Sequence, residues 1–491
     1  MNFSEVIRQE AKWTKTENGA DVKNTTESAL LDLFAEIGAM RTRPDGEIIQ
    51  KFELAWQEDP LGAVRCAFYA RDIRGGLGER RVFRVLLPYM AEKHPEALFE
   101  NLGLIGFYGR YDDLYSLVGT KLEDLMWQTV KAQLAEDEEA RRAKKPCSLL
   151  AKWLKKADAT SQNTKKLGIY TAKKLDMSVY DYKRLCNRLR KHIDVVEQRM
   201  SAQAWETIHY PSVPSRAMMQ YRNAFGRHDE ERFSAYLDRV HAGEEKIRAA
   251  ALYPYDIVEK LLYKKEDSRV LEAQWSSLPD YVGQAVNAMV MADVSGSMSG
   301  RPMATSIGLA MYFAERNQGA YHNLFMTFSG EPQFVEIKGT TIREKITFIS
   351  KAHWEMNTDL EAALFKILEV AKKSGCAKDE MPKALLIVSD MEIDRCAGQN
   401  YKESFCEYAF RAYNAAGYQI PNLIFWNVSS RHDVFLADKK RKGVQLVSGQ
   451  SAGTFRHVLA ALDRTPAEAM YQILNSERYG AVGIKKPDRL P

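Results

Sequence analysis

The residues best suited to chemistry lie in one short stretch, MVMADVSGSMSGRPM, at positions 289–303. An apolar run ends at Asp293, and Ser295 and Ser297 follow at alternate positions. Carboxylate and hydroxyl oxygens are the ligands that a hard divalent cation such as Mg²⁺ prefers, in near-octahedral order. We therefore expect this stretch to supply part of a metal site.

Two further residues fall where such a site needs them. Thr358 lies in a loop just before a helix predicted from Leu360, and Asp390 follows the apolar run KALLIVS. Ligands of open α/β sheets bind at the carboxyl ends of the strands, so these loops should meet at one edge of the sheet. The predicted metal ligands are Asp293, Ser295, Ser297, Thr358 and Asp390. Because most of them are neutral hydroxyls, the cation would keep much of its charge and attract an acidic side chain of a partner.

The order D-x-S-x-S, then Thr, then Asp resembles the metal-ion-dependent adhesion site of von Willebrand factor A domains. The resemblance covers residues 284–462. It implies a Rossmann-like α/β fold with Mg²⁺, or another divalent cation, at the top of the sheet. It also implies that Ser295, Ser297 and Thr358 coordinate the ion, whereas Asp293 and Asp390 coordinate it directly or through water. Taken alone, D-V-S-G-S is also common where a strand turns into a helix.

A basic segment is the second candidate site. Residues 141–199 hold 17 Lys and Arg against five Asp and Glu, with aromatic residues interleaved. Cations for phosphates and rings for unstacked bases are typical of single-stranded RNA binding. The alternative is a set of solvated helix faces whose charges are balanced by acidic neighbours. The RNA-binding candidates here are Lys152, Trp153, Lys155, Lys156, Lys165, Lys166, Lys173, Lys174, Lys183, Arg184, Arg188, Arg190 and Lys191.

A third segment, FYARDIRGGLGERRVF at positions 68–83, places arginines around a glycine-rich turn. The turn opens a predicted helix, and helix N-termini bind anions. Arg71, Arg74 and Arg80 are therefore further RNA-binding candidates. The interpretation we favour is a helix corner in which Asp72 and Glu79 pair with arginines.

The elements that must position these residues change character along the chain. As far as about residue 279, apolar positions at helical spacing alternate with Pro and Gly breakers, and no strand alternation is evident. We expect an all-helical, HEAT-like array over residues 1–280. Examples of the predicted helices are 27–40, 81–93, 114–134, 179–200 and 230–243.

Residues 281–491 alternate apolar runs with amphipathic helices, which predicts an α/β domain with a mostly parallel sheet and further helices at its C-terminal end. The predicted strands are 288–292, 323–328, 333–337, 384–388, 423–428 and 444–447, the third of them an antiparallel edge strand. The predicted helices are 303–315, 342–351, 360–373, 403–416, 455–462 and 467–478.

A wider resemblance covers nearly the whole chain. It rests on RDIRGGLGERRVF (71–83), GFYGRYDDLYSL (106–117), VPSRAMMQYRNAFGRHDEERFSAYL (213–237) and ALYPYDIV (251–258), followed by the metal-site segment. In this order the chain resembles a domain-of-unknown-function family that is similar to the Ro autoantigen and its TROVE module. In Ro-type proteins a ring of HEAT-like helices joined to a von Willebrand A domain binds small non-coding RNAs. RNA is therefore an expected partner, although no RNA-contacting residue carries over individually.

Composition bounds these hypotheses. The chain of 491 residues is 45% hydrophobic with a net charge of +5, which indicates a globular protein without a global field for nucleic acid. The six cysteines lack zinc spacing, and no targeting or membrane-spanning segment is evident, so we expect reduced thiols in the cytoplasm. No catalytic set stands out, and we expect no enzyme. A protein–protein adaptor without RNA is the alternative, and a metal-dependent hydrolase is the lesser one.

Overall fold

The computed structural model describes residues 11–263, 269–283, 287–328, 330–350, 359–394 and 405–485. The chain divides into two compact units. The α/β unit comprises Met1–Val82 and Ala249–Gly480, and the helical unit comprises Phe83–Arg248 and Ala481–Pro491. The sequence predicted instead one division, between residues 280 and 281. The observed division places the first 82 residues with the sheet.

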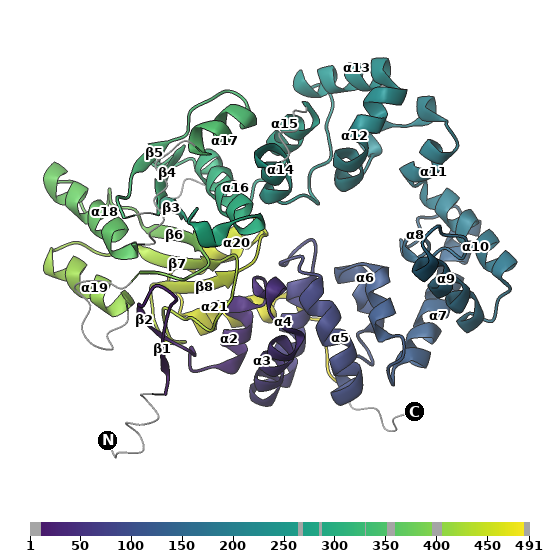
Figure 1. The fold of residues 1–491 in the computed structure, drawn as a ribbon, viewed down its shortest axis with the longest axis horizontal. Coiled ribbons are helices and arrows are strands. Elements are labelled where there is room, and N and C mark those ends of the chain that lie inside the picture. Colours follow the sequence, from purple (N-terminus) through teal and green to yellow (C-terminus); the bar gives the residue numbers. More distant parts are fainter. Residues whose placement is uncertain are drawn as a thin grey trace. The chain divides into compact units, whose positions relative to one another are not determined.

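The centre of the α/β unit is a six-stranded sheet in the order β5-β4-β3-β6-β7-β8 (Figure 1). All neighbouring strands are parallel except β5, which pairs antiparallel with β4, as predicted for this edge strand. The strands are β3 (Ala288–Ala292), β4 (Leu324–Thr327), β5 (Phe334–Glu336), β6 (Ala384–Ser389), β7 (Asn422–Asn427) and β8 (Val444–Ser448). Every residue of β3, β6 and β8 is buried, which explains the continuous apolar runs of β3 and β6.

Helices cover both faces of this sheet. Helices α18 and α19 lie on one face (Figure 1). Their buried residues pack with alternate strand residues such as Met291 and Ile387 in a single cluster. On the other face, α16 contacts β3, β4 and β6. The helices of the α/β unit after residue 249 are α14 (Pro254–Leu262), α15 (Arg269–Ser276), α16 (Arg301–Arg316), α17 (Ile342–Ser350), α18 (Leu360–Ser374), α19 (Phe405–Ala415), α20 (Thr454–Leu459) and α21 (Pro466–Leu474). The predicted mixture of a helical part and an α/β part is therefore confirmed.

Local signals fix the ends of these helices. The Asp359 side chain accepts a hydrogen bond from the backbone N–H of Ala362 at the start of α18, and Gly375 ends that helix in the left-handed conformation. At α21, Thr465 and Glu468 form a reciprocal capping box. Such caps explain why the predicted helices of this region agree with the structure to within a few residues.

The N-terminal part of the α/β unit contains two strands that the sequence did not predict. Strands β1 (Trp13–Lys15) and β2 (Asp21–Lys23) form an antiparallel hairpin, so the expectation of an all-helical N-terminal part was wrong here. Strands of three residues are too short to display a period of two. The helices that follow are α2 (Ala29–Glu36), α3 (Asp45–Glu58) and α4 (Pro60–Arg71).

The helical unit consists of short helices separated by turns. Its helices are α5 (Arg81–Lys93, which begins two residues before the unit), α6 (Ile105–Tyr108), α7 (Glu123–Arg142), α8 (Leu150–Trp153), α9 (Gln162–Lys174), α10 (Val179–Ile193), α11 (Val196–Ser201), α12 (Ser215–His228) and α13 (Glu230–His241). The helix predicted over 179–200 is divided, because Asp194 adopts the left-handed conformation with φ 57°. Among the described helices of the whole chain, none combines the length and apolarity that crossing a bilayer requires.

Candidate functional site

The carboxyl ends of β3 and β6 bring Asp293 and Asp390 together. Each residue directly follows its strand, and the two strands are parallel neighbours in register, Ala292 opposite Val388. The backbone N–H of Asp293 donates to the carbonyl oxygen of Val388 at 2.9 Å. Both carboxylates are buried. The sequence motif therefore lies at the predicted edge of the sheet.

Asp293 is held by the residues on either side of it. One carboxylate oxygen accepts the backbone N–H of Ser295 at 2.8 Å, and the other accepts the hydroxyl of Ser389 at 2.7 Å. Burial, and after it the nearby Asp390, raise the pKa of Asp293, and these two hydrogen bonds oppose the rise; the resulting pKa is about 6. A buried carboxylate with a raised pKa beside a second carboxylate is a place where a cation would be stabilised.

The two serine hydroxyls lie next to each other. Ser295 Oγ and Ser297 Oγ share a hydrogen bond at 3.0 Å, in which either hydroxyl can donate, with Ser295 buried and Ser297 exposed. Neighbouring ligands of an octahedral Mg²⁺, each about 2.1 Å from the ion, stand about 3.0 Å apart. The pair therefore fits two adjacent corners of such a shell and opens toward solvent at Ser297. Thr358, the fifth predicted ligand, lies outside the described residues.

Asp390 has a partner that the sequence did not reveal. The Arg431 guanidinium, in the loop after β7, contacts Asp390 Oδ2 at 2.7 Å and Glu17 at 2.9 Å. Glu17 lies in the turn between β1 and β2, and its backbone N–H donates to Glu392 at 2.7 Å. Three segments far apart in the chain thus meet at Asp390: the β1–β2 turn, the loop after β6 and the loop after β7. No local pattern joins Arg431 or Glu17 to the motif, so only the fold could find them.

The basic candidates form two groups: those paired with other protein groups and those exposed to solvent. Many are held in place by other side chains: Lys174 pairs with Asp124, Lys183 with Asp158 and Arg188 with Glu138. Lys152 lies 3.7 Å from Glu197, and buried Arg190 donates to the carbonyl oxygens of Ala151 and Leu154. This is the balanced pattern that the alternative interpretation predicted for part of the segment.

A smaller set of basic residues remains exposed. Within the described residues, Lys165, Lys166, Lys173 and Lys191 are exposed and make no side-chain hydrogen bond or ion pair, and Lys156 is exposed as well. Tyr180 is 67% exposed, and the Arg184 guanidinium lies 5.5 Å from its ring centroid. The remaining members contact rings: Lys155 lies over Tyr115, and Arg110 stacks on Trp153.

The glycine-rich segment forms the predicted corner, with distant partners. Asp72 is buried and accepts hydrogen bonds from Arg478 and from Tyr479, the latter at 3.0 Å. Glu79 pairs with Arg41 at 3.2 Å. Arg71 is buried, whereas Arg74 and Arg80 are exposed. These three belong to the α/β unit, and the other basic candidates belong to the helical unit.

Comparison with known proteins places these features in a family. The family model described as Domain of unknown function (DUF2828) matches residues 16–167 and 142–285, which together span more than half of the chain. The chain belongs to this family. A second family model, Domain of unknown function (DUF7788), matches residues 287–481, the segment that carries the metal motif.

One relative is the uncharacterized protein L728 of Acanthamoeba polyphaga mimivirus, which is 26% identical to this chain over 501 residues. The similarity covers 94% of this chain and 86% of that protein. Both parts of the chain therefore occur together in that relative.

Proposed function

We propose that the chain is a non-enzymatic binding scaffold whose α/β unit holds a divalent cation, Mg²⁺ in the first instance, and uses it to bind an acidic group of a partner. Asp293, Ser295, Ser297 and Asp390 would hold the ion, together with Thr358, which precedes α18 in the sequence. The separation of 3.0 Å between the two serine hydroxyls is the observation that carries this proposal. The resemblance of the motif to a von Willebrand A adhesion site supports the same assignment.

The bound ion would supply a positive charge at the sheet edge. Asp293, oriented by Ser389, would counter part of that charge from the buried side, and exposed Ser297 would mark the open side. An acidic group from a partner could then complete the shell. A two-metal hydrolase usually gathers more carboxylates around its ions than the motif supplies.

Thermal unfolding with Mg²⁺ or with chelator tests the metal site. We expect Mg²⁺ to raise the melting temperature of the wild-type chain and not of Asp293→Ala, since a ligand that binds only the folded state stabilises it. Asp379→Asn, which changes an exposed carboxylate elsewhere, is the matched control and should respond like wild type. Equal Mg²⁺ stabilisation of wild type and Asp293→Ala would refute the assignment.

RNA binding by the helical unit is a second candidate, favoured by the exposed lysines of α9 and by Tyr180. Lys166, Ile169 and Lys173 recur at helical spacing on α9, and Ile169 is 43% exposed. Cations flanking exposed apolar and aromatic groups suit a flexible RNA strand. The similarity to Ro-type proteins, in which HEAT-like helices bind small RNAs, supports the same interpretation.

RNA co-purification with the full chain from its native host, followed by sequencing, tests this candidate. We expect a discrete set of small RNAs that is lost from the charge reversal Lys165→Glu/Lys166→Glu. The same reversal at Lys372 and Lys373 of α18 alters net charge equally and should retain the RNA. An RNA-free preparation, or equal loss from both variants, would leave the cation-dependent adaptor as the function.

A further inference from the structure

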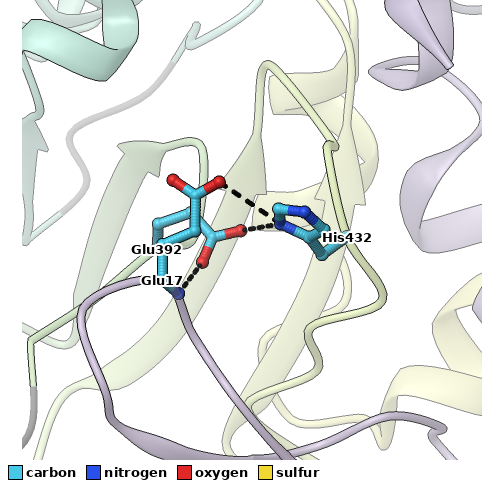
Figure 2. Close-up of side chains that lie close together, drawn as sticks. All are labelled: Glu17, Glu392 and His432. Carbon is cyan, nitrogen blue, oxygen red and sulfur yellow. Dashed lines mark hydrogen bonds and ion pairs between the residues drawn. The ribbon is translucent and has the colours of Figure 1, made fainter.

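A second group of metal-ligating side chains lies near Asp390. Glu17 comes from the turn between β1 and β2, Glu392 from the loop after β6, and His432 from the loop after β7. Figure 2 shows both carboxylates directed toward the imidazole ring. One donor atom from each residue lies within 4.8 Å of the other two.

The distances suit a small coordination shell. His432 Nδ1 is 3.1 Å from a carboxylate oxygen of Glu392 and 3.6 Å from one of Glu17. Donors placed about 2.0–2.1 Å from a tetrahedral ion are about 3.3–3.4 Å apart. The two measured separations bracket this spacing, so an ion could enter with small side-chain adjustments.

The scaffold positions these ligands independently of the cluster. Thr16 Oγ1 donates to the carbonyl oxygen of Ile393 at 2.7 Å, and Asn18 Nδ2 donates to that of Glu392 at 2.8 Å. The turn that carries Glu17 is therefore fixed to the strand loop on both sides of it. Ligands held by surrounding hydrogen bonds bind a metal with less loss of conformational freedom.

The charges also favour a cation. Glu392 is only 3% exposed, and a carboxylate oxygen of Glu17, which is 44% exposed, lies within 4.8 Å of one of its own. Arg431 contacts the other oxygen of Glu17 at 2.9 Å, and a different oxygen of Glu17 lies nearest His432. Two neighbouring carboxylates, one of them buried, are stabilised when a cation lies between them.

We propose that Glu17, Glu392 and His432 form a second metal site, which takes a borderline divalent ion such as Zn²⁺ through Nδ1 and two carboxylate oxygens. An imidazole ligand selects Zn²⁺-like ions over Mg²⁺, which separates this site from the serine-rich one. The neutral ring would carry its proton on Nε2. Because Glu17 and His432 are exposed, water or a partner's donor group would take the fourth position.

Such an ion would fasten the N-terminal hairpin to the carboxyl edge of the sheet. The hairpin precedes α2, and its turn contacts the loop after β6 through the hydrogen bonds and the cluster described above and through the bridge from Gly19 to Asp394. This inference stands apart from the proposed function, because none of its three ligands belongs to the Asp293 site.

Cobalt titration of the full chain tests the second site, because Co²⁺ replaces Zn²⁺ and absorbs visible light strongly in low-symmetry sites. We expect one equivalent of Co²⁺ to bind wild type with a visible band that Zn²⁺ abolishes. His432→Ala and Glu17→Gln should weaken binding by more than about 100-fold, since even outer-shell changes cost about 10- to 100-fold. His209→Ala removes an exposed histidine of the helical unit and should bind like wild type.

Substitutions in one proposed metal site should leave ion binding at the other site unchanged, which distinguishes the two sites. Asp293→Ala should retain the Co²⁺ band, whatever its response to Mg²⁺. Wild-type protein that takes up no Co²⁺ or Zn²⁺, or Glu17→Gln that binds as tightly as His209→Ala, would overturn the inference. Glu17 lies on an exposed turn, so Glu17→Gln still decides the question if circular dichroism shows that His432→Ala fails to fold.

Discussion

Ser389 orients the carboxylate at the centre of the proposed Mg²⁺ site without being a proposed ligand. Its hydroxyl donates to Asp293 at 2.7 Å and accepts the backbone N–H of Met391 at 3.0 Å. We expect Ser389→Ala to lower Mg²⁺ affinity by about 10- to 100-fold, the usual effect of losing an outer-shell partner. Calorimetric titration with Mg²⁺ measures this. Ser306→Ala removes a buried serine that contacts the Val388 carbonyl instead, and its affinity should stay near wild type.

Arg431 places a fixed positive charge against one proposed ligand, Asp390. A cation at this distance both competes for the carboxylate and repels Mg²⁺. We expect Arg431→Gln to tighten Mg²⁺ binding by roughly tenfold, since one charge a few ångströms away contributes a kcal/mol or more near a protein surface. Calorimetry at two salt concentrations measures the effect. An unchanged or weaker affinity would mean that Arg431 orients Asp390 rather than opposing the ion.

Glu123 gives the helical unit a pH-dependent contribution to stability. Burial raises its pKa, but hydrogen bonds from Tyr170, Trp127 and the Gly119 backbone outweigh this and lower it to about 2. A depressed carboxyl pKa contributes stability above the unfolded value near 4.5 and loses it as pH falls toward 2. Glu123→Gln should therefore lower the free energy of unfolding by about 1–2 kcal/mol at pH 7, and by progressively less below pH 4. Urea unfolding at pH 7 and pH 3 measures the difference, and an equal loss at both values would contradict it.

The residues of the proposed Mg²⁺ site differ in how far the sequence could reveal them. Asp293, Ser295 and Ser297 form a local pattern, and Asp390 follows a recognisable buried strand. Arg431 and Glu17 lie 41 and 373 positions from Asp390 in the numbering, and no periodicity connects them to it. His432 has no zinc-like neighbour in sequence, yet it faces Glu392 in space. Such groupings depend on strand order, which the sequence does not state.

At the scale of elements, Gly168 lets α9 approach the preceding segment closely. A Cβ atom there would lie 2.5 Å from the backbone nitrogen of Ala157 and 2.5 Å from the carbonyl carbon of Lys156. Backbone atoms cannot move aside cheaply, so we expect Gly168→Ala to lower the free energy of unfolding by about 1–3 kcal/mol. Gly226 of α12 has nothing within 4 Å, and Gly226→Ala should be neutral or stabilising by up to about 1 kcal/mol. Denaturant unfolding of both variants gives the comparison, and equal effects would show that α9 can shift.

The elements themselves were predicted unevenly. Buried parallel strands such as β3 and β6 produce apolar runs that are bounded by turns, and these were found almost to the residue. The hairpin β1–β2 was missed because its strands have three residues each. The division between α10 and α11 was missed because Asp194 adopts a left-handed conformation. Non-glycine residues rarely do so, and the sequence around Asp194 does not predict it.

At the scale of the whole molecule, the α/β unit is discontinuous in sequence. Its first segment reaches the last one through Asp72, which is 0% exposed and contacts Arg478 and Tyr479. We expect Asp72→Ala to lower the free energy of unfolding by about 3–5 kcal/mol, as when one partner of a buried ion pair is removed. Lys373→Ala breaks an exposed ion pair with Glu369 and should change the free energy of unfolding by less than about 1 kcal/mol. Thermal unfolding of both variants measures this, and similar small losses would show that Asp72 does not join the segments.

The discontinuity could not be predicted from composition. Helical periodicity continues from residue 27 to residue 276 without marking where the chain passes from one unit to the other. The sequence therefore favoured a division at the first strand of the sheet. The structure instead allots the helices before residue 82 to the sheet, because their apolar faces pack there: α2 contacts β8 and α4 contacts α21.

The arrangement of Asp72 and Arg478 also has a consequence for synthesis on the ribosome. The two residues are 406 positions apart, so at about 5–20 residues per second roughly 20–80 seconds separate their translation. During that interval the apolar surfaces of the N-terminal segment lack the C-terminal residues that cover them in the folded unit. Residues 83–248 can already fold as a compact intervening unit. A nascent chain of this kind is exposed to aggregation for most of its elongation, and holding chaperones would have their greatest effect before residue 478 emerges.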